Sequence, residues 1–151
     1  MLKNIDPLLT PELLKVLCEM GHGDEVVLAD ANFTAESLGK GKIVLRLPGA
    51  DMAAACAAVL SVFPLDEMVD QPVAYMQVSG TAEGYRSAVQ REVVGALVAR
   101  GDALDAQCEA IERFAFYERV KNCYAIVQTG EMQAYGNFLF KKGVIAHALR
   151  P

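Results

Sequence analysis

Apolar residues along this chain alternate between helical spacing and short continuous runs. Four segments have the length and spacing of helices, at residues 10–20, 51–62, 83–100 and 114–122. Six short runs bounded by glycine, proline or polar residues favour strands, at residues 26–29, 43–47, 72–78, 109–113, 124–128 and 135–140. The polar, glycine-containing stretch 32–42 predicts a loop.

Helix start and stop signals support this reading. Thr10 is a good N-cap residue, Pro11 suits the first helical position, and Glu12 is an acid at the positive end of the helix. Gly21 and Gly101 follow the first helix and the longest helix, where glycine commonly ends a helix.

Strands and helices alternate almost throughout, which predicts an α/β fold in which helices flank a single sheet. The run 26–29 is apolar without interruption, and this is typical of a strand buried on both faces. The chain has 151 residues, the length of one domain, and no linker or internal repeat divides it. We therefore expect a single domain over residues 1–151.

Composition excludes several classes of function. The net charge is −5 and no block of lysine or arginine is present, which argues against a nucleic-acid partner. The longest uncharged apolar stretch, 52–65, is too short to span a bilayer, and the N-terminus lacks the apolar core of a signal peptide. We therefore expect a cytoplasmic protein with no membrane partner.

The four cysteines, at positions 18, 56, 108 and 123, form no close pair and predict reduced, mostly buried thiols. The sequence contains no ligand spacing typical of a metal site, no phosphate loop and no dinucleotide fingerprint. We expect neither a metal nor a cofactor.

Candidate chemistry gathers beside the ends of predicted strands. His22 lies between two glycines on a helix-to-strand turn, and a histidine there is well suited to proton transfer. Asp30 follows the first strand, Arg113 ends another, and Tyr135 and Asn137 open the last one. An anion, a planar cation, a phenol and an amide together suit a small, neutral, polyhydroxylated ligand better than a metal or a nucleotide.

Each of these residues has a simpler interpretation. His22 could be a surface turn residue, and Asp30 could cap the following loop. Arg113 could pair with a neighbouring glutamate, Tyr135 could pack half-buried, and Asn137 could be a polar residue of an edge strand.

Three segments resemble the L-fucose mutarotase branch of the fucose mutarotase and ribose pyranase family. They are Leu13 to Glu25, which contains Met20-Gly21-His22-Gly23-Asp24-Glu25, the segment Arg113-Phe114-Ala115-Phe116-Tyr117-Glu118-Arg119, and the C-terminal stretch from Thr129 to Val144 with Tyr135-Gly136-Asn137 and Lys141-Lys142-Gly143. About half of the chain carries the resemblance, and residues 40–107 match no recognised pattern. Residues 144–151 resemble an extension at the C-terminus.

The resemblance implies an α/β protein that assembles into ring-shaped homo-oligomers, often decamers, with sites near subunit contacts. It implies interconversion of the α and β anomers of a free monosaccharide without cofactor or metal. The family role in proton transfer falls on His22, sugar contact falls on Asp30 and Arg113, and a further site segment falls on residues 135–137. Arginine at 113 and glycine at 136 favour the fucose branch over the ribose branch.

The expected reaction fits these side chains. A base removes the proton of the anomeric hydroxyl, an acid protonates the ring oxygen, and the open aldehyde recloses on its other face. We expect His22 to be the main proton-transfer group, and Tyr135 to be either its partner or a sugar ligand. Asp30, Arg113, Gly136 and Asn137 complete the expected substrate site. The alternatives are a non-catalytic monosaccharide-binding module and a structural ring protein.

Overall fold

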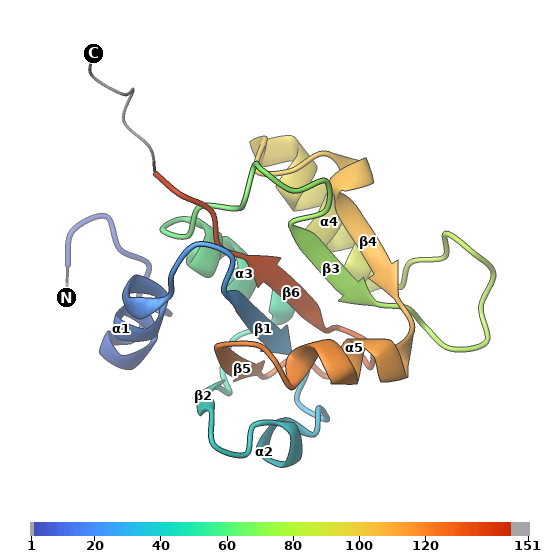
Figure 1. Cartoon of the computed structure of the whole chain (residues 1–151), viewed down its shortest axis with the longest axis horizontal. Coiled ribbons are helices and arrows are strands. Elements are labelled where there is room, and N and C mark those ends of the chain that lie inside the picture. The colour runs from blue at the N-terminus through green and yellow to red at the C-terminus, as the bar shows by residue number, and fades with distance from the viewer. Residues whose placement is uncertain (1, 146–151) are drawn as a thin grey trace.

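A mixed sheet of six strands forms the centre of the protein in a computed structural model, which describes residues 2–145 (Figure 1). The strand order is β2-β5-β1-β6-β3-β4. The strands are β1 (Glu25–Ala29), β2 (Ile43–Leu47), β3 (Val73–Met76), β4 (Cys108–Ile111), β5 (Ala125–Thr129) and β6 (Phe138–Lys141). Register shows that β6 alone runs antiparallel to its neighbours β1 and β3, whereas β1, β2 and β5 run parallel, as do β3 and β4.

Helices cover both faces of this sheet (Figure 1). The helices are α1 (Pro11–Glu19), α2 (Ala35–Leu38), α3 (Met52–Leu60), α4 (Ala88–Arg100) and α5 (Arg113–Val120), with a short 3-10 turn η1 (Asp105–Gln107). One apolar core joins α1, α3 and α4 to residues such as Val26 and Leu28, and a second joins α2 and α5 to Val27 and Ala29. Successive side chains of β1 therefore pack alternately into the two cores. This confirms the predicted α/β fold and the prediction that this strand is buried on both faces.

Side-chain caps fix where the helices begin. Thr10, Asp51 and Ser87 each accept a hydrogen bond from the backbone N–H three residues later. Gly101 ends α4 in the left-handed conformation, at a φ of 75°. The C-terminal residue of α1 differs from expectation. Met20, with extended backbone, ends the helix in place of Gly21, which follows it.

Several predicted elements and boundaries were wrong. The expected loop 32–42 contains the short helix α2, which Thr34 precedes without a side-chain cap. The longest helix begins at Ala88 and not at residue 83, because Ser87 forms a capping box with Gln90 and Gly84 is left-handed. The last strand begins at Phe138, so residues 135–137 lie in the turn before it.

The direction of the strands defines two edges of the sheet. The carboxyl ends of the five mutually parallel strands lie at one edge, which we call the carboxyl edge, and β6 begins there. Their amino ends lie at the opposite edge, the amino edge, where β6 ends. Which edge a polar residue occupies therefore depends on whether it precedes or follows its strand.

Two further sequence expectations concern cysteines and membranes. All four cysteines are free thiols, and three of them are buried; only Cys18 is exposed. Burial raises the pKa of both the Cys108 and Cys123 thiols to about 11, so they stay protonated near neutral pH. Of the helices within residues 2–145, none combines the length and apolar character needed to cross a lipid bilayer.

Candidate functional site

A buried carboxylate–amide pair lies at the carboxyl edge. Asn137 Nδ2 donates to Asp30 Oδ2 at 2.9 Å, and the backbone N–H of Asp30 donates to Asn137 Oδ1 at 2.9 Å. The two side chains meet because β1 and β6 are adjacent and antiparallel, with Leu28 opposite Phe138. Asn137 is 2 % exposed and lies at the start of a central strand, so it is not a polar residue of an edge strand.

The environment of Asp30 makes its charge costly. Burial raises the pKa of this carboxyl above its ordinary value, although hydrogen bonds from Asn137 and from the backbone of Asn32 and Tyr135 oppose the shift. Asp30 Oδ1 accepts from Asn32 N at 3.0 Å, so Asp30 also stabilises the following loop, as the simpler interpretation suggested. Each carboxylate oxygen can accept more than one hydrogen bond, so Asp30 can accept from a ligand hydroxyl as well as from its protein donors.

Tyr135 has a strained backbone beside this pair. Its φ is +64°, a left-handed conformation that costs an aromatic residue about 1–3 kcal/mol and often marks a functional position. The neighbouring Gly136 is buried, and a Cβ there would lie 3.1 Å from the Gln133 carbonyl oxygen and from Glu131 Cγ. Glycine at 136 thus allows the turn to approach its neighbours closely, and the half-buried Tyr135 packs on the second core.

Arg113 belongs to the same edge, since it follows β4 and opens α5. Its guanidinium lies 4.6 Å from the ring centre of Phe114 and 6.0 Å from that of Tyr117. The Nε atom is buried without a hydrogen-bond partner among the described residues. Glu112 instead accepts from two backbone N–H groups of α5, and Glu109 pairs with Arg119, so neither neighbouring glutamate holds Arg113. The rings of Phe114 and Tyr117 therefore hold the Arg113 guanidinium in place, while its Nε–H donates to no described residue.

His22 lies at the opposite, amino edge, and its partner there is Asp66. His22 Nε2 is 3.2 Å from Asp66 Oδ2; the imidazole is 44 % exposed and the carboxylate only 4 %. The backbone N–H of Met68 and the His22 ring lower the pKa of Asp66, although burial opposes the shift. When His22 donates its Nε2 proton to Asp66, Nδ1 is the nitrogen that can accept a proton.

The end of β6 holds both members of this pair. Lys142 N donates to Asp24 O and Gly23 N donates to Lys142 O, each at 2.8 Å, which attaches the His22 turn to the strand. On the other side, Asp66 N donates to Lys141 O at 3.1 Å. Gly143 permits this contact, because a Cβ there would lie 2.4 Å from the Leu65 carbonyl oxygen.

One chain therefore does not bring all the expected site residues together. Asp30, Arg113, Tyr135, Gly136 and Asn137 lie at the carboxyl edge, whereas His22 lies at the amino edge. The length of β1, five residues or roughly 16 Å at about 3.3 Å per residue, separates the two groups. Within a single chain, His22 and Asp30 cannot share a pocket, because the two residues precede and follow the same strand; a site that contains both stays a prediction and needs a subunit contact.

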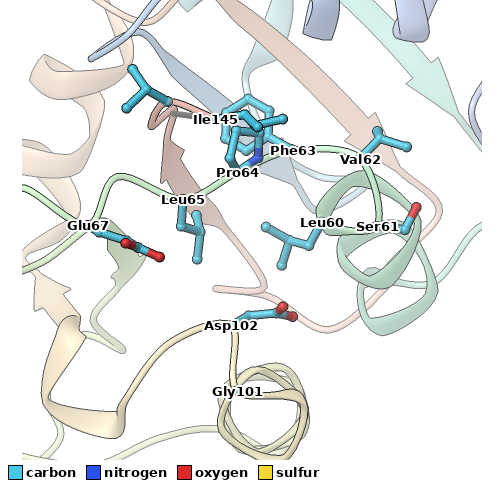
Figure 2. A pocket seen from close by; sticks show the side chains of 11 residues that line it. Leu60, Ser61, Val62, Phe63, Pro64, Leu65, Glu67, Gly101, Asp102 and Ile145 are labelled. Carbon is cyan, nitrogen blue, oxygen red and sulfur yellow. The ribbon is translucent and has the colours of Figure 1, made fainter. Parts of the chain in front are cut away.

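A cavity of about 480 Å³ lies elsewhere, between residues 60–67, the end of α4 and the residues after β6 (Figure 2). Apolar side chains such as Leu60 and Leu65 line it together with the acids Asp102 and Glu67, and polar atoms make up more of its surface than apolar ones. The expected site residues do not line it. Within residues 2–145, no group of three or more histidine, cysteine and acidic side chains is arranged to hold a metal ion.

Sequence reasoning missed two polar residues that contact the site. Asp66 is one of three acids in the segment between α3 and β3, and Gln90 is the third residue of α4. Only the capping box Ser87–Gln90 carries a sequence signal, and that signal indicates a helix start and not a site. Asp66 lies 44 residues from His22 in the sequence, so no local pattern encodes the pairing of these two side chains.

The fold and the two polar groups define a small α/β protein built on one mixed sheet, with a carboxylate–amide pair at one edge and a histidine–carboxylate pair at the other. The sequence profile of the RbsD / FucU transport protein family matches residues 3–145, and the chain belongs to that family. This confirms the resemblance found in the sequence.

Individual relatives agree with the family match. The L-fucose mutarotase of Glaesserella parasuis is 46 % identical over 144 residues, which cover 95 % of this chain and 96 % of that protein. The crystal structure of FucU from Bifidobacterium longum superposes with a TM-score of 0.86 at 42 % identity, covering 94 % of this chain and 99 % of the other. The fucose mutarotase of Streptococcus pneumoniae, solved in complex with L-fucose, gives a TM-score of 0.84 at 37 % identity and covers 96 % of this chain and all of its own.

Proposed function

We propose that this protein is an isomerase that interconverts the α and β anomers of L-fucose by cofactor-independent acid–base catalysis. The observation that carries the proposal is the 46 % identity, over almost the whole of both chains, to a protein named L-fucose mutarotase. The complex of a 37 % identical structure with L-fucose supports the same sugar. Ring opening needs a proton-transfer group and ligands for the sugar hydroxyls. The histidine at the amino edge offers the first, and the polar residues at the carboxyl edge offer the second.

In this mechanism His22 transfers the proton between the anomeric hydroxyl and the ring oxygen, and Asp66 orients the imidazole. Asp30 and Asn137 bind sugar hydroxyls, since a carboxylate accepts and an amide both donates and accepts. Arg113 donates from its guanidinium, which is consistent with the unused Nε. The Tyr135 phenol is the second acid–base candidate, and Gly136, the remaining residue proposed for the substrate site, lets the turn that carries Tyr135 pack closely on Gln133 and Glu131.

These roles require a second copy of the chain. Because β1 separates His22 from Asp30 within one chain, a complete site needs the amino edge of one subunit against the carboxyl edge of another. Such a head-to-tail contact generates a closed ring when its rotation closes. We propose a homo-oligomeric ring, a decamer, of single-domain subunits over residues 1–151 that acts in cytoplasmic carbohydrate metabolism. The expected C-terminal extension, 144–151, lies outside the described residues apart from Val144 and Ile145.

Saturation-transfer NMR between the α and β anomeric protons tests the activity. The wild-type protein should accelerate exchange of L-fucose, and parallel samples with galactose and ribose establish sugar preference. His22→Gln should lower the accelerated rate by at least roughly a hundredfold, the usual contribution of a general acid–base group. The chain's other histidine offers a matched control, His147→Gln, which should exchange at the wild-type rate.

The alternatives give different results. Sugar binding without accelerated exchange by the wild-type protein would identify a monosaccharide-binding module, and absence of binding would identify a structural ring protein. If His22→Gln remains folded and fully active, the proton-transfer role belongs to another residue.

A further inference from the structure

Gln90 is a fully buried side chain in the first turn of α4, and it uses both ends of its amide. Its Oε1 accepts from Ser87 N at 3.0 Å, which completes the capping box of the helix. Its Nε2 donates to the carbonyl oxygens of Met76 at 2.7 Å and Tyr135 at 2.9 Å. Both amide protons are therefore used outside the helix, and the residue is 0 % exposed.

A capping box by itself does not need these donors. It needs an acceptor at this position, and glutamate serves as well as glutamine. An ionised glutamate could not donate to two carbonyls, and it would bring a charge into the core. A glutamine amide both accepts at the helix start and donates to the two carbonyl oxygens. The hydrogen bonds of Nε2 therefore serve a purpose other than helix capping.

The two carbonyls that it binds flank the substrate residues. The Tyr135 carbonyl belongs to the residue in the left-handed conformation, at a φ of +64°. Met76 ends β3, and its N–H donates to the Asn137 carbonyl at 3.1 Å. A second contact joins the same elements, because Val89 N donates to Gln133 Oε1 at 2.7 Å. The first turn of α4 is thus attached to the turn before β6 at two points.

We infer that Gln90 is a positioning residue for the sugar site. Its amide holds the Tyr135 peptide in the left-handed conformation and thereby fixes the direction of the Tyr135 phenol relative to the Asn137 amide. Gln90 is buried and does not touch the sugar. The inference rests on the proposed function, since it concerns residues of that site.

The test compares Gln90→Met, which keeps the size of the side chain and removes the donors and the acceptor, with Ser87→Ala. The Ser87→Ala variant weakens the same helix start but leaves the contact to Tyr135 in place, so it serves as the matched control. Both variants are assayed for L-fucose exchange after light scattering has confirmed that each retains the wild-type assembly. Gln90→Met should lower the exchange rate by roughly ten- to a hundredfold, mainly in kcat, and Ser87→Ala should stay close to wild type.

A double-mutant cycle separates positioning from a general structural effect. If Gln90 acts through the Tyr135 phenol, Gln90→Met should reduce exchange much less in a Tyr135→Phe background than in the wild type. Equal fold-losses in the two backgrounds would overturn the inference, as would wild-type exchange by Gln90→Met. If Gln90→Met fails to assemble, Gln90→Leu replaces it, because that variant also removes the donors and places no charge in the core. The proposed function fails separately, when the wild-type protein itself does not accelerate exchange.

Discussion

At the scale of single residues, the site depends on polar groups whose neighbours determine their chemistry. Asp30 accepts from the neutral amide of Asn137 and from a backbone N–H, whereas Asp66 accepts from a backbone N–H and contacts the His22 ring. The two carboxyls consequently have pKa values shifted in opposite directions, raised for Asp30 and lowered for Asp66. Separate electrostatic environments at the two edges suit separate roles, hydroxyl binding and orientation of a proton-transfer group.

Asp30→Asn should separate stability from activity. Because burial raises the pKa of Asp30, ionisation of this group lowers stability as the pH rises through its folded pKa. The neutral amide removes that penalty but loses one acceptor, so the free energy of unfolding at pH 7 should change by less than about 1 kcal/mol. Exchange of L-fucose should fall at least about tenfold, because a charged acceptor for sugar hydroxyls is lost.

Urea unfolding and NMR exchange measure the two quantities for Asp30→Asn. Asp70→Asn, at an exposed loop position, is the matched control and should alter neither. Full activity in Asp30→Asn would remove Asp30 from the set of sugar ligands.

At the scale of elements, β6 connects the two halves of the site. Residues 135–137 lie just before this strand, and the hydrogen bonds that hold His22 and Asp66 lie at its other end. Lys142 reinforces that end, since its Nζ donates to the carbonyl oxygens of Leu17 and Met20 at the C-terminus of α1. A change at the end of β6 should therefore affect the His22 turn without any contact to the sugar.

Gly143→Ala tests this connection. The new Cβ would lie 2.4 Å from the Leu65 carbonyl oxygen, so the segment that carries Asp66 must move away. We expect a loss of about 1–3 kcal/mol in the free energy of unfolding, the usual cost of overpacking, together with reduced exchange. Gly95→Ala is the control, because a Cβ there meets no atom within 4 Å and alanine favours the helix. Wild-type exchange in Gly143→Ala would show that the Leu65 contact does not hold the His22–Asp66 pair.

The ion pairs around β1 predict how stability depends on pH. Burial by itself raises the pKa of Glu25, but the hydrogen bonds and charges of Arg119 and Lys141 outweigh it and hold the pKa below the ordinary value of 4.5. A lowered pKa stabilises the protein above the unfolded value, and this stabilisation is lost as the pH falls below about 4.5.

Glu25→Gln should accordingly lower the free energy of unfolding at pH 7 by about 2 kcal/mol, and the difference from wild type should shrink toward pH 3. Urea unfolding at fixed protein concentration across this range measures it. Glu36→Gln removes an exposed ion pair to Arg46 and should change little at either pH. A difference for Glu25→Gln that is constant with pH would contradict the assignment.

At the scale of the whole molecule, the proposed active site requires an assembly. Variants of opposite edges can therefore complement each other. His22→Ala and Asp30→Asn should each be nearly inactive alone, yet their co-expression should restore up to about a quarter of the wild-type exchange, since random assembly pairs two intact edges in that fraction of sites.

Light scattering must accompany the complementation experiment, and a stable monomer at micromolar concentration would reject the ring. If co-expression restores no exchange in an intact oligomer, then His22 and Asp30 do not act in one composite site. A mixture of His22→Ala with wild type, which contains both intact edges in known proportion, calibrates the recovery.

Local patterns in the sequence were sufficient for the class of fold and most of its elements. The apolar run of β1, the Thr10 cap and the glycine after α4 have local physical causes, and all three are present in the structure. The motifs around His22 and Arg113 were sufficient for the family, and the relatives agree with it. Predicted boundaries were wrong where the periodic pattern extended past a capping residue. At Ser87, for example, the capping box starts α4 five residues later than predicted.

The arrangement of the site residues was decided by tertiary structure. Sequence order cannot reveal that β6 enters the sheet antiparallel between β1 and β3, because strand pairing depends on contacts about a hundred residues apart. That single insertion joins Asn137 to Asp30 at one edge and brings the end of the strand to His22 at the other. The sequence by itself determined which chemical groups the protein carries. The fold determined that a strand separates His22 from Asp30 within each chain, because strand direction assigns to opposite edges the residues that precede and follow a strand.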